Sequence, residues 1–245
     1  MITSIQNDKV KNWKKLQKRK ERRKSGTFLV EGFHLVEEAR KSEWQLQEII
    51  VQEGIEIPSW CRSLAITEVG ENVFQYISET RTPQGIAAIV SIKQPSEIMG
   101  NYILLIDAIQ DPGNLGTIIR TADAAGFDAV VLGDGTVDLF NDKVIRSTQG
   151  SIFHIPITQE PLESRIKSLQ KENFSIWATA LTDAKPFHRI EKQEKVGLIV
   201  GNEGAGIHEN ILEMANTIVN IPIYGKAESL NVSVAAGILM YHVKM

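Results

Sequence analysis

The chain has 245 residues, of which 42% are apolar, so it can form one large domain or two modest ones with a buried core. A single cysteine, Cys61, excludes an intrachain disulfide and a cysteine-rich zinc site. No apolar run approaches the length of a transmembrane helix, and the N-terminus lacks the apolar core of a secretory signal. We therefore expect a cytoplasmic globular protein that does not bind a membrane.

The formal net charge of −3 conceals a strongly basic N-terminal segment. Ten lysines and arginines fall within residues 1–25, and only Asp8 and Glu21 oppose them. Such a density attracts a phosphate backbone, although a solvated helix face or a frayed arm has the same composition. We assign residues 1–25 to a basic N-terminal arm.

Residues 26–92 have the pattern of a small α/β domain. The expected elements are strands at Thr27–Val30, Glu48–Val51, Ile66–Val69 and Ile86–Val90, a helix within Glu31–Lys41 and a short helix at Val73–Ile77. Residues 93–100 are mostly polar, contain a proline and end in glycine, which is typical of a linker.

From residue 101 to 245 strands and helices alternate. The predicted strands are Tyr102–Asp107, Ala129–Leu132, Ile155–Ile157, Ile176–Thr179, Val196–Val200 and Thr217–Ile221; the predicted helices start at Asn114 and Ser229 or cover Asn141–Thr148, Leu162–Lys171 and Ile207–Ala215. This alternation predicts a mostly parallel sheet with helices on both faces. The last helix is apolar on more than one side, so we expect it to be buried against the sheet or a second subunit.

The first of three polar turns in this domain follows the strand that begins at Tyr102. Asp111-Pro112-Gly113 breaks that strand, and Asn114 can cap the helix that carries Arg120. Helix capping and a surface arginine are the ordinary roles of such residues. Their position at the ligand-binding edge of a parallel sheet favours a functional Arg120, because guanidinium groups bind phosphates and carboxylates.

The second turn, Gly201-Asn202-Glu203-Gly204-Ala205-Gly206, lies between a strand and a helix, where backbone amides can approach a ligand. Its glycines do not have the G-x-G-x-x-G spacing of dinucleotide sites. The Glu203 carboxylate suits a hydroxyl, an amine or an arginine and not a pyrophosphate. The turn therefore disfavours NAD and ATP as ligands.

The third turn precedes the last helix. Ser229 can act as a plain helix cap, whereas Asn231, one position into the expected helix, gains little from local bonding. The loop 221–225 adds backbone carbonyls that suit a flat heterocycle, so an adenosine ligand without phosphates fits this region. The five histidines have no metal-ligand spacing, and we predict no metal site.

These motifs resemble those of the SpoU (TrmH) family of RNA 2′-O-ribose methyltransferases, within the SPOUT superfamily. The matching residues are Asn114 and Arg120 in the first motif, Glu203 in the second, and Ser229 and Asn231 in the third. Residues 28–32 and 36–39 are similar to the start of the L30e-like substrate-binding domain often joined to it. The resemblance therefore covers nearly the whole chain.

The resemblance implies S-adenosylmethionine as methyl donor, a homodimer, and methylation of a ribose in structured RNA, with ribosomal RNA favoured over transfer RNA. It also implies a C-terminal SPOUT domain with a deep trefoil knot, preceded by a smaller L30e-like α/β domain. The residues by themselves predict only an unknotted doubly wound sheet. The alternatives are a non-catalytic RNA-binding ribosome-assembly factor and a nucleotide-dependent enzyme such as a dehydrogenase; the glycine spacing disfavours the second.

By the same resemblance, residue roles can be assigned. The catalytic set is Arg120, Asn114, Glu203, Ser229 and Asn231. The family's usual proposal makes the arginine the base, but a guanidinium stays protonated, so our hypothesis is that Arg120 binds the target phosphate and orients the 2′-hydroxyl. The cofactor would be held by Thr179, Ala180, Gly201, Asn202, Gly204, Ile221, Ile223, Leu230 and Asn231. The candidate RNA contacts are Lys14, Lys18, Arg19, Arg22 and Arg23 in the arm, together with Lys143 and Arg146, which could equally belong to a solvated face.

Overall fold

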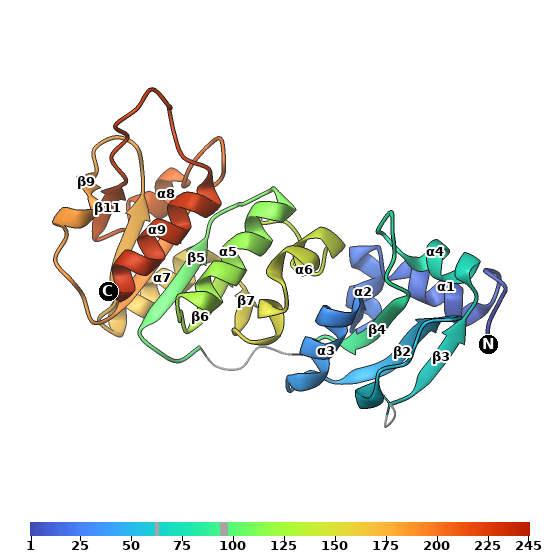
Figure 1. The fold of residues 1–245 in the computed structure, drawn as a ribbon. Helices are drawn as coiled ribbons and strands as arrows, with labels where there is room; N and C mark the ends of the chain where they lie inside the picture. The colour runs from blue at the N-terminus through green and yellow to red at the C-terminus, as the bar shows by residue number, and fades with distance from the viewer. Residues whose placement is uncertain (62–63, 94–97) are drawn as a thin grey trace. The chain divides into compact units, whose positions relative to one another are not determined.

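The computed structural model describes residues 1–61, 64–93 and 98–245, which form two compact units (Figure 1). The first unit comprises Met1–Gln94 and Asp138–Phe153, and the second comprises Pro95–Val137 and His154–Met245. Part of the predicted linker 93–100, namely residues 94–97, lies outside the described residues. The domain boundaries drawn from the sequence stay a prediction.

The first unit is a four-stranded sheet in the order β1-β4-β2-β3. Its strands are β1 (Thr27–Glu31), β2 (Leu46–Gln52), β3 (Ile66–Val69) and β4 (Ile86–Ser91), and its N-terminal part also contains helices α1 (Asp8–Lys15), α2 (Arg19–Ser25), α3 (Phe33–Lys41) and α4 (Glu71–Ile77). β4 runs antiparallel to β1 and β2, whereas β2 and β3 are parallel. The predicted elements of this half are all present, with ends shifted by one or two residues.

The basic N-terminal segment is folded. Val10, Trp13 and Leu16 are buried and belong to one core cluster with Val73 and Phe74 of α4. Because these apolar residues recur at helical spacing, α1 buries one face and exposes its lysines on the other. The first 25 residues thus contain two helices, and α1 contributes to the core of the unit, which differs from the arm expected from charge alone.

The segment 138–153 belongs to the first unit although the sequence pattern placed its helix, α6 (Asp142–Thr148), in the second half. Phe140 and Phe153 join an aromatic cluster with Phe28 of β1: the ring centroids of Phe28 lie 4.6 Å from Phe140 and 6.4 Å from Phe153. Trp44 completes the cluster, with its ring centroid 5.6 Å from that of Phe153. Aromatic burial of this kind holds the segment against β1.

The second unit is a seven-stranded sheet in the order β7-β6-β5-β10-β8-β11-β9, in which every pair of neighbours is parallel. The strands are β5 (Tyr102–Ile106), β6 (Ala129–Leu132), β7 (Ile157–Gln159), β8 (Ser175–Thr179), β9 (Lys185–Pro186), β10 (Val196–Val200) and β11 (Thr217–Asn220). The predicted parallel sheet is confirmed. β9 was not predicted, because two residues that include a proline carry no strand pattern.

Helices cover both faces of this sheet. They are α5 (Pro112–Ala124), α7 (Leu162–Lys171), α8 (Glu209–Leu212) and α9 (Val232–Lys244). Ile103 and Leu105 of β5 pack with apolar residues of α7 and α8, while α5 and α9 lie side by side on the other face (Figure 1). Strand residues buried on both faces explain the continuous apolar runs in the sequence. None of the helices in the described part of the chain is long and apolar enough to span a membrane.

We predict that Phe153→Ala destabilises the first unit by roughly 3 kcal/mol, because Phe153 is 7% exposed and its removal leaves a cavity in the aromatic cluster. Hydrogen exchange measured by mass spectrometry should show faster exchange in β1 and β4. Phe187→Ala, a partly buried phenylalanine of the second unit, is the control and should leave β1 and β4 protected. Unchanged exchange of β1 in the Phe153 variant would contradict the assignment.

Candidate active site

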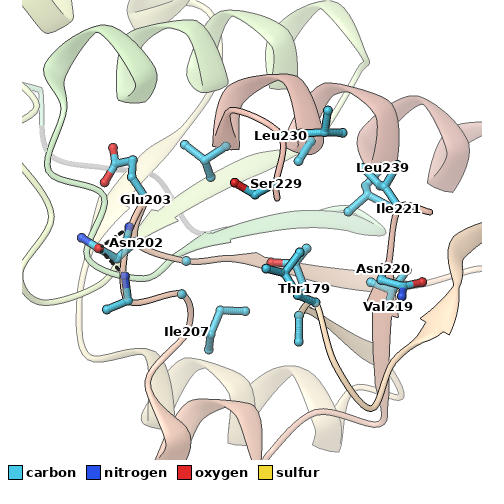
Figure 2. Close-up of a pocket in the computed structure, with 18 of the residues that line it drawn as sticks. Thr179, Asn202, Glu203, Ile207, Val219, Asn220, Ile221, Ser229, Leu230 and Leu239 are labelled. Atoms are coloured by element: carbon cyan, nitrogen blue, oxygen red, sulfur yellow. Dashed lines mark hydrogen bonds between the residues drawn. The ribbon is translucent and has the colours of Figure 1, made fainter. Parts of the chain in front are cut away.

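The three polar turns meet at one edge of the parallel sheet, beyond the carboxyl ends of β5, β10 and β11. A cavity of about 620 Å³ opens there. Eight of the nine predicted cofactor residues line it, and Asn231 lies outside the lining. The eight are Thr179, Ala180, Gly201, Asn202, Gly204, Ile221, Ile223 and Leu230. Figure 2 shows Asn202 and Glu203 at one end of the cavity and Asn220 at the other.

The side chain of Asn202 fixes the turn 201–206. Its Oδ1 accepts hydrogen bonds from the backbone N–H groups of Gly204 (2.9 Å) and Ala205 (3.0 Å), drawn as dashed lines in Figure 2. Its Nδ2 donates to the carbonyl of Ala108 (2.9 Å), a residue with a positive φ of 55° directly beyond β5. The backbone of Asn202 also pairs with that of Gly206 in both directions. Asn202 therefore shapes the turn and ties it to the end of β5.

Gly201 is required by close packing of the backbone. A Cβ atom at this position would lie 2.4 Å from the carbonyl carbon of Gly206 and 2.5 Å from the nitrogen of Ile207. Because both neighbours are backbone atoms, any side chain at position 201 would displace the turn. The glycine thus lets the chain fold back over itself beside the cavity.

The Glu203 carboxylate joins the first two motifs. Its Oε1 accepts from Asn114 Nδ2 (3.1 Å) and from the Asp111 N–H (3.1 Å), and its Oε2 accepts from the Gln110 N–H (3.3 Å). Asn114 Oδ1 in turn accepts from Asn231 Nδ2 (3.1 Å), which adds the third motif. Three turns far apart in the sequence are therefore linked by one hydrogen-bonded chain of side chains.

The pKa of Glu203 lies below its ordinary value of 4.5. Partial burial raises this pKa, but the hydrogen bonds from Asn114 and from the backbone amides of Glu203, Asp111 and Gln110 stabilise the carboxylate and outweigh the effect of burial. Glu203 is consequently ionised at neutral pH and accepts hydrogen bonds without donating any.

The helix caps differ from those expected. Asp111, not Asn114, caps α5, since its Oδ1 accepts from the Asn114 N–H (2.8 Å). Asn231, not Ser229, caps α9, since its Oδ1 accepts from the backbone N–H (2.8 Å) and hydroxyl (2.6 Å) of Ser233. The capping of α5 by Asp111 leaves the side chain of Asn114 available for Glu203. Asn231 has a local role that the sequence reasoning missed.

Arg120 and Ser229 are not part of this hydrogen-bonded chain. Arg120 lies on α5, two turns beyond Asn114, and is exposed without a hydrogen bond or ion pair to any described residue. Ser229 is exposed and lines the cavity. The structure thus brings Asn114, Glu203 and Asn231 together and leaves the Arg120 guanidinium unengaged within the described chain.

The predicted RNA contacts of the basic segment lie in α1, in α2 and between them. Lys18 and Arg23 are exposed, and the Lys14 ammonium lies 5.1 Å from the centroid of the Tyr76 ring. Arg19 is exposed as well and its Nε lies 3.5 Å from Asp138 Oδ1. Lys18, Arg19 and Arg23 are thus exposed on the first unit, whereas Lys14 is half-buried.

Arg22 differs from its predicted role. It is 6% exposed, donates from Nη1 to the Leu16 carbonyl (2.6 Å) and pairs through Nη2 with Asp138. A guanidinium buried in this way serves the packing of α2 against the segment 138–153 and is not open to a phosphate. Of the two candidates on α6, Lys143 is exposed, and Arg146 pairs with Asp142 at 2.7 Å.

Several cavity residues were not predicted. Most are apolar residues that a sequence pattern assigns to the core, and the rest are one polar residue at a strand end and one glutamate in a loop. They include Leu181, Ile207, Leu212, Val219, Asn220, Glu228, Val232, Ala235 and Leu239. Within the described ranges 1–61, 64–93 and 98–245, no three histidine, cysteine or acidic side chains lie close enough together to hold a metal ion.

Comparison with known families agrees with this geometry. Residues 101–241 match the SpoU rRNA Methylase family, and residues 7–88 match the MRM3-like substrate binding domain. The second match begins within the basic segment, in agreement with the position of α1 in the first unit.

Individual relatives are similar over almost the whole chain. The 23S rRNA (guanosine(2553)-2′-O)-methyltransferase RlmP of Bacillus subtilis (strain 168) is 50% identical over 244 residues, covering 99% of this chain and 98% of the relative. A crystal structure of an AdoMet-bound rRNA methyltransferase from Sinorhizobium meliloti superposes with a TM-score of 0.89 at 32% identity and covers 99% and 96% of the two chains. An RNA 2′-O ribose methyltransferase superposes with a TM-score of 0.84 at 32% identity, with coverage of 99% and 97%.

The lowered pKa of Glu203 predicts a pH-dependent contribution to stability. Since the folded-state pKa lies below 4.5, ionised Glu203 stabilises the folded unit above about pH 4.5, and this contribution is lost as the pH falls through the folded-state pKa. Glu203→Gln should therefore lower the melting temperature at pH 7, and its difference from wild type should shrink below pH 4.5. Calorimetry from pH 7 to pH 3 measures this difference.

The control is Glu213→Gln, because Glu213 is exposed and its carboxylate has no hydrogen-bond partner among the described residues. It should melt like the wild type throughout this pH range. A gap between wild type and Glu203→Gln that stays constant down to pH 3 would contradict the prediction.

Proposed function

Because the chain belongs to the SpoU rRNA methylase family, we propose that it transfers the methyl group of S-adenosylmethionine to a ribose 2′-hydroxyl of ribosomal RNA. The observation that carries this proposal is the hydrogen-bonded chain from Glu203 through Asn114 to Asn231 beside the cavity. It unites one residue from each family motif at the edge where a parallel sheet binds its ligand.

The cavity fits S-adenosylmethionine. The charged side chains among its described lining residues are Glu203 and Glu228, and the rest of the lining is backbone, apolar or neutral polar. A lining without cations disfavours phosphates, whereas two carboxylates favour a positively charged ligand. When bound, S-adenosylmethionine supplies an electrophilic methyl group on a cationic sulfonium.

The residues around the cavity hold the two reactants in position. We assign to Arg120 the binding of the target phosphate and the orientation of the ribose, since its guanidinium is exposed and engages no described residue. Asn114 and Glu203 hold the turn after β5 beside the target 2′-hydroxyl. Ser229 and Asn231 lie on the other side of that hydroxyl. Arg120 stays protonated, so the hydroxyl proton passes to the phosphate or to water. Alignment of this kind supplies about 7 to 11 kcal/mol of barrier reduction.

We propose 23S rRNA as the substrate, at the guanosine that corresponds to the one methylated by the Bacillus subtilis relative. The first unit would bind this RNA through Lys14, Lys18, Arg19 and Arg23, because these cations, three of them exposed and Lys14 half-buried, lie on α1, on α2 and between them and suit a phosphate backbone. Lys143 and Arg146 are further candidate contacts, because the segment 138–153 belongs to the same unit. A cytoplasmic location would suit this substrate, because the Bacillus subtilis relative is named as a 23S rRNA methyltransferase.

We further propose a homodimer through α9, and a knotted C-terminus. Val234, Ile238 and Tyr241 are 50%, 37% and 47% exposed and recur every three or four residues, so they form one apolar stripe. The opposite side of α9 is already buried in the protein, which leaves this stripe for a second copy of the chain. The trefoil knot is supported by the family to which the chain belongs.

The runner-up is a ribosome-assembly factor that binds RNA and does not methylate it. The exposed cations and the substrate-binding unit suit both functions. An assembly factor gives no reason for Asn114, Glu203 and Asn231 to form a hydrogen-bonded chain beside a cavity, so the site favours the methyltransferase.

The dimer predicts that Val234→Glu with Ile238→Glu yields a folded monomer, because two buried charges in a small interface cost more than the apolar contact gains. Light scattering after gel filtration should show half the mass of the wild type. Ile57→Glu, an equally exposed isoleucine of the first unit, is the control and should remain dimeric. A wild-type protein that is monomeric at micromolar concentration would contradict the proposal.

The activity is tested by transfer of label from S-adenosylmethionine to 23S rRNA or ribosomal particles from cells that lack the protein. Wild type should label one ribose, at a position then resistant to alkaline cleavage. Arg120→Lys should lower turnover at saturating RNA by about a hundredfold, because an ammonium cannot reproduce the planar fork of guanidinium. Arg189→Lys, at another exposed arginine, is the control.

Full turnover by Arg120→Lys would overturn the role given to Arg120. Binding of S-adenosylmethionine without label in any RNA or particle would favour the assembly factor.

A further inference from the structure

Asp107 and His208 form a hydrogen-bonded pair that the proposed function leaves without a role. Asp107 follows β5 and is 4% exposed, whereas 61% of the His208 side chain is exposed. The Asp107 carboxylate accepts the His208 backbone N–H at Oδ2 (2.7 Å) and the ring Nδ1–H at Oδ1 (2.9 Å). Within the described chain, these are the hydrogen bonds that compensate a nearly buried carboxylate.

The pair closes one end of the segment 201–208. Asn202 attaches the other end through its hydrogen bond to the Ala108 carbonyl. Residues 204–207, between the two attachments, line the cavity. One end of the segment is thus attached to Asp107 and the other to the adjacent Ala108, both beyond β5, so these contacts as well as the turn itself fix the position of this wall of the cavity.

Removal of the imidazole would leave the Asp107 carboxylate with one hydrogen bond instead of two. A buried carboxylate that loses a donor either draws in water or moves toward solvent. Either response displaces His208 and with it Ile207, which touches the cavity. Asn202 keeps its own bonds, so the displacement remains confined to one end of the wall.

We propose that His208 is a positioning residue for the methyl-donor pocket, acting through the bond between its Nδ1–H and Asp107. This inference rests on the proposed function, because it takes the cavity as the S-adenosylmethionine site. His208 does not line the cavity and acts only through Ile207 and the turn that precedes it.

Three substitutions separate the ring nitrogens. His208→Ala removes both, His208→Asn places an amide nitrogen near the position of Nδ1, and His208→Gln places one near Nε2. Titration calorimetry with the full-length protein should show a dissociation constant for S-adenosylmethionine about tenfold higher for His208→Ala, which is the scale of one hydrogen bond to a charged group. His208→Asn should restore binding, and His208→Gln should not.

A purely structural role is excluded by the kinetic pattern. The KM for S-adenosylmethionine should rise in His208→Ala while the KM for RNA stays near wild type, and the melting temperature of the free protein should fall because a nearly buried carboxylate loses one donor. Glu209→Gln, at the adjacent exposed residue, is the control and should bind like wild type. Rescue by Gln and not by Asn, or an unchanged dissociation constant in His208→Ala, would overturn the inference.

The same titration separates this inference from the proposed function. A wild-type protein that does not bind S-adenosylmethionine refutes both. A wild-type protein that binds it as tightly as His208→Ala does refutes the role of His208 alone.

Discussion

The site depends on a single hydrogen-bond acceptor, the carboxylate of Glu203. Two backbone amides and the Asn114 side chain converge on it from the turn after β5, and Asn231 is attached through Asn114. Without that carboxylate the turn after β5 would have unpaired donors, and Asn114, which accepts from Asn231, would lose the acceptor for its own amide nitrogen. These hydrogen bonds lower the pKa of Glu203, because each donor that is fixed in place favours the charged form of the carboxylate.

Local sequence patterns predicted the elements well because their physical causes are local. The apolar runs at 103–106 and 196–200 predict buried parallel strands, and the turn residues between strand and helix predict where the site lies. The identities of the motif residues, through the family they resemble, supplied the cavity lining. Eight of the nine residues assigned to the cofactor line one cavity. That these residues bind S-adenosylmethionine stays a prediction.

The sequence could not predict which residues meet across long separations. Asp111 and Asn114 are both good caps, and only the three-dimensional position of Glu203 decides that Asn114 is used elsewhere. In the sequence, Arg22 is one of ten cations in a basic run and is predicted to bind RNA. In the structure it pairs with Asp138, which lies 116 residues away in the chain. The hydrogen bond between Asp107 and His208 likewise joins residues 101 positions apart, and no local sequence pattern predicts it.

The placement of residues 138–153 in the first unit has a consequence for how the protein is made. The first 94 residues leave the ribosome without Phe140, Phe153 and Asp138, which complete the aromatic cluster and neutralise the buried Arg22. Domains generally fold as units during synthesis, N-terminal first. Here the N-terminal unit cannot finish until residue 153 of 245 has emerged, after β5, α5 and β6 of the other unit are already outside. During synthesis the aromatic cluster is therefore incomplete, and its exposed apolar surface is open to aggregation until residues 138–153 have been made.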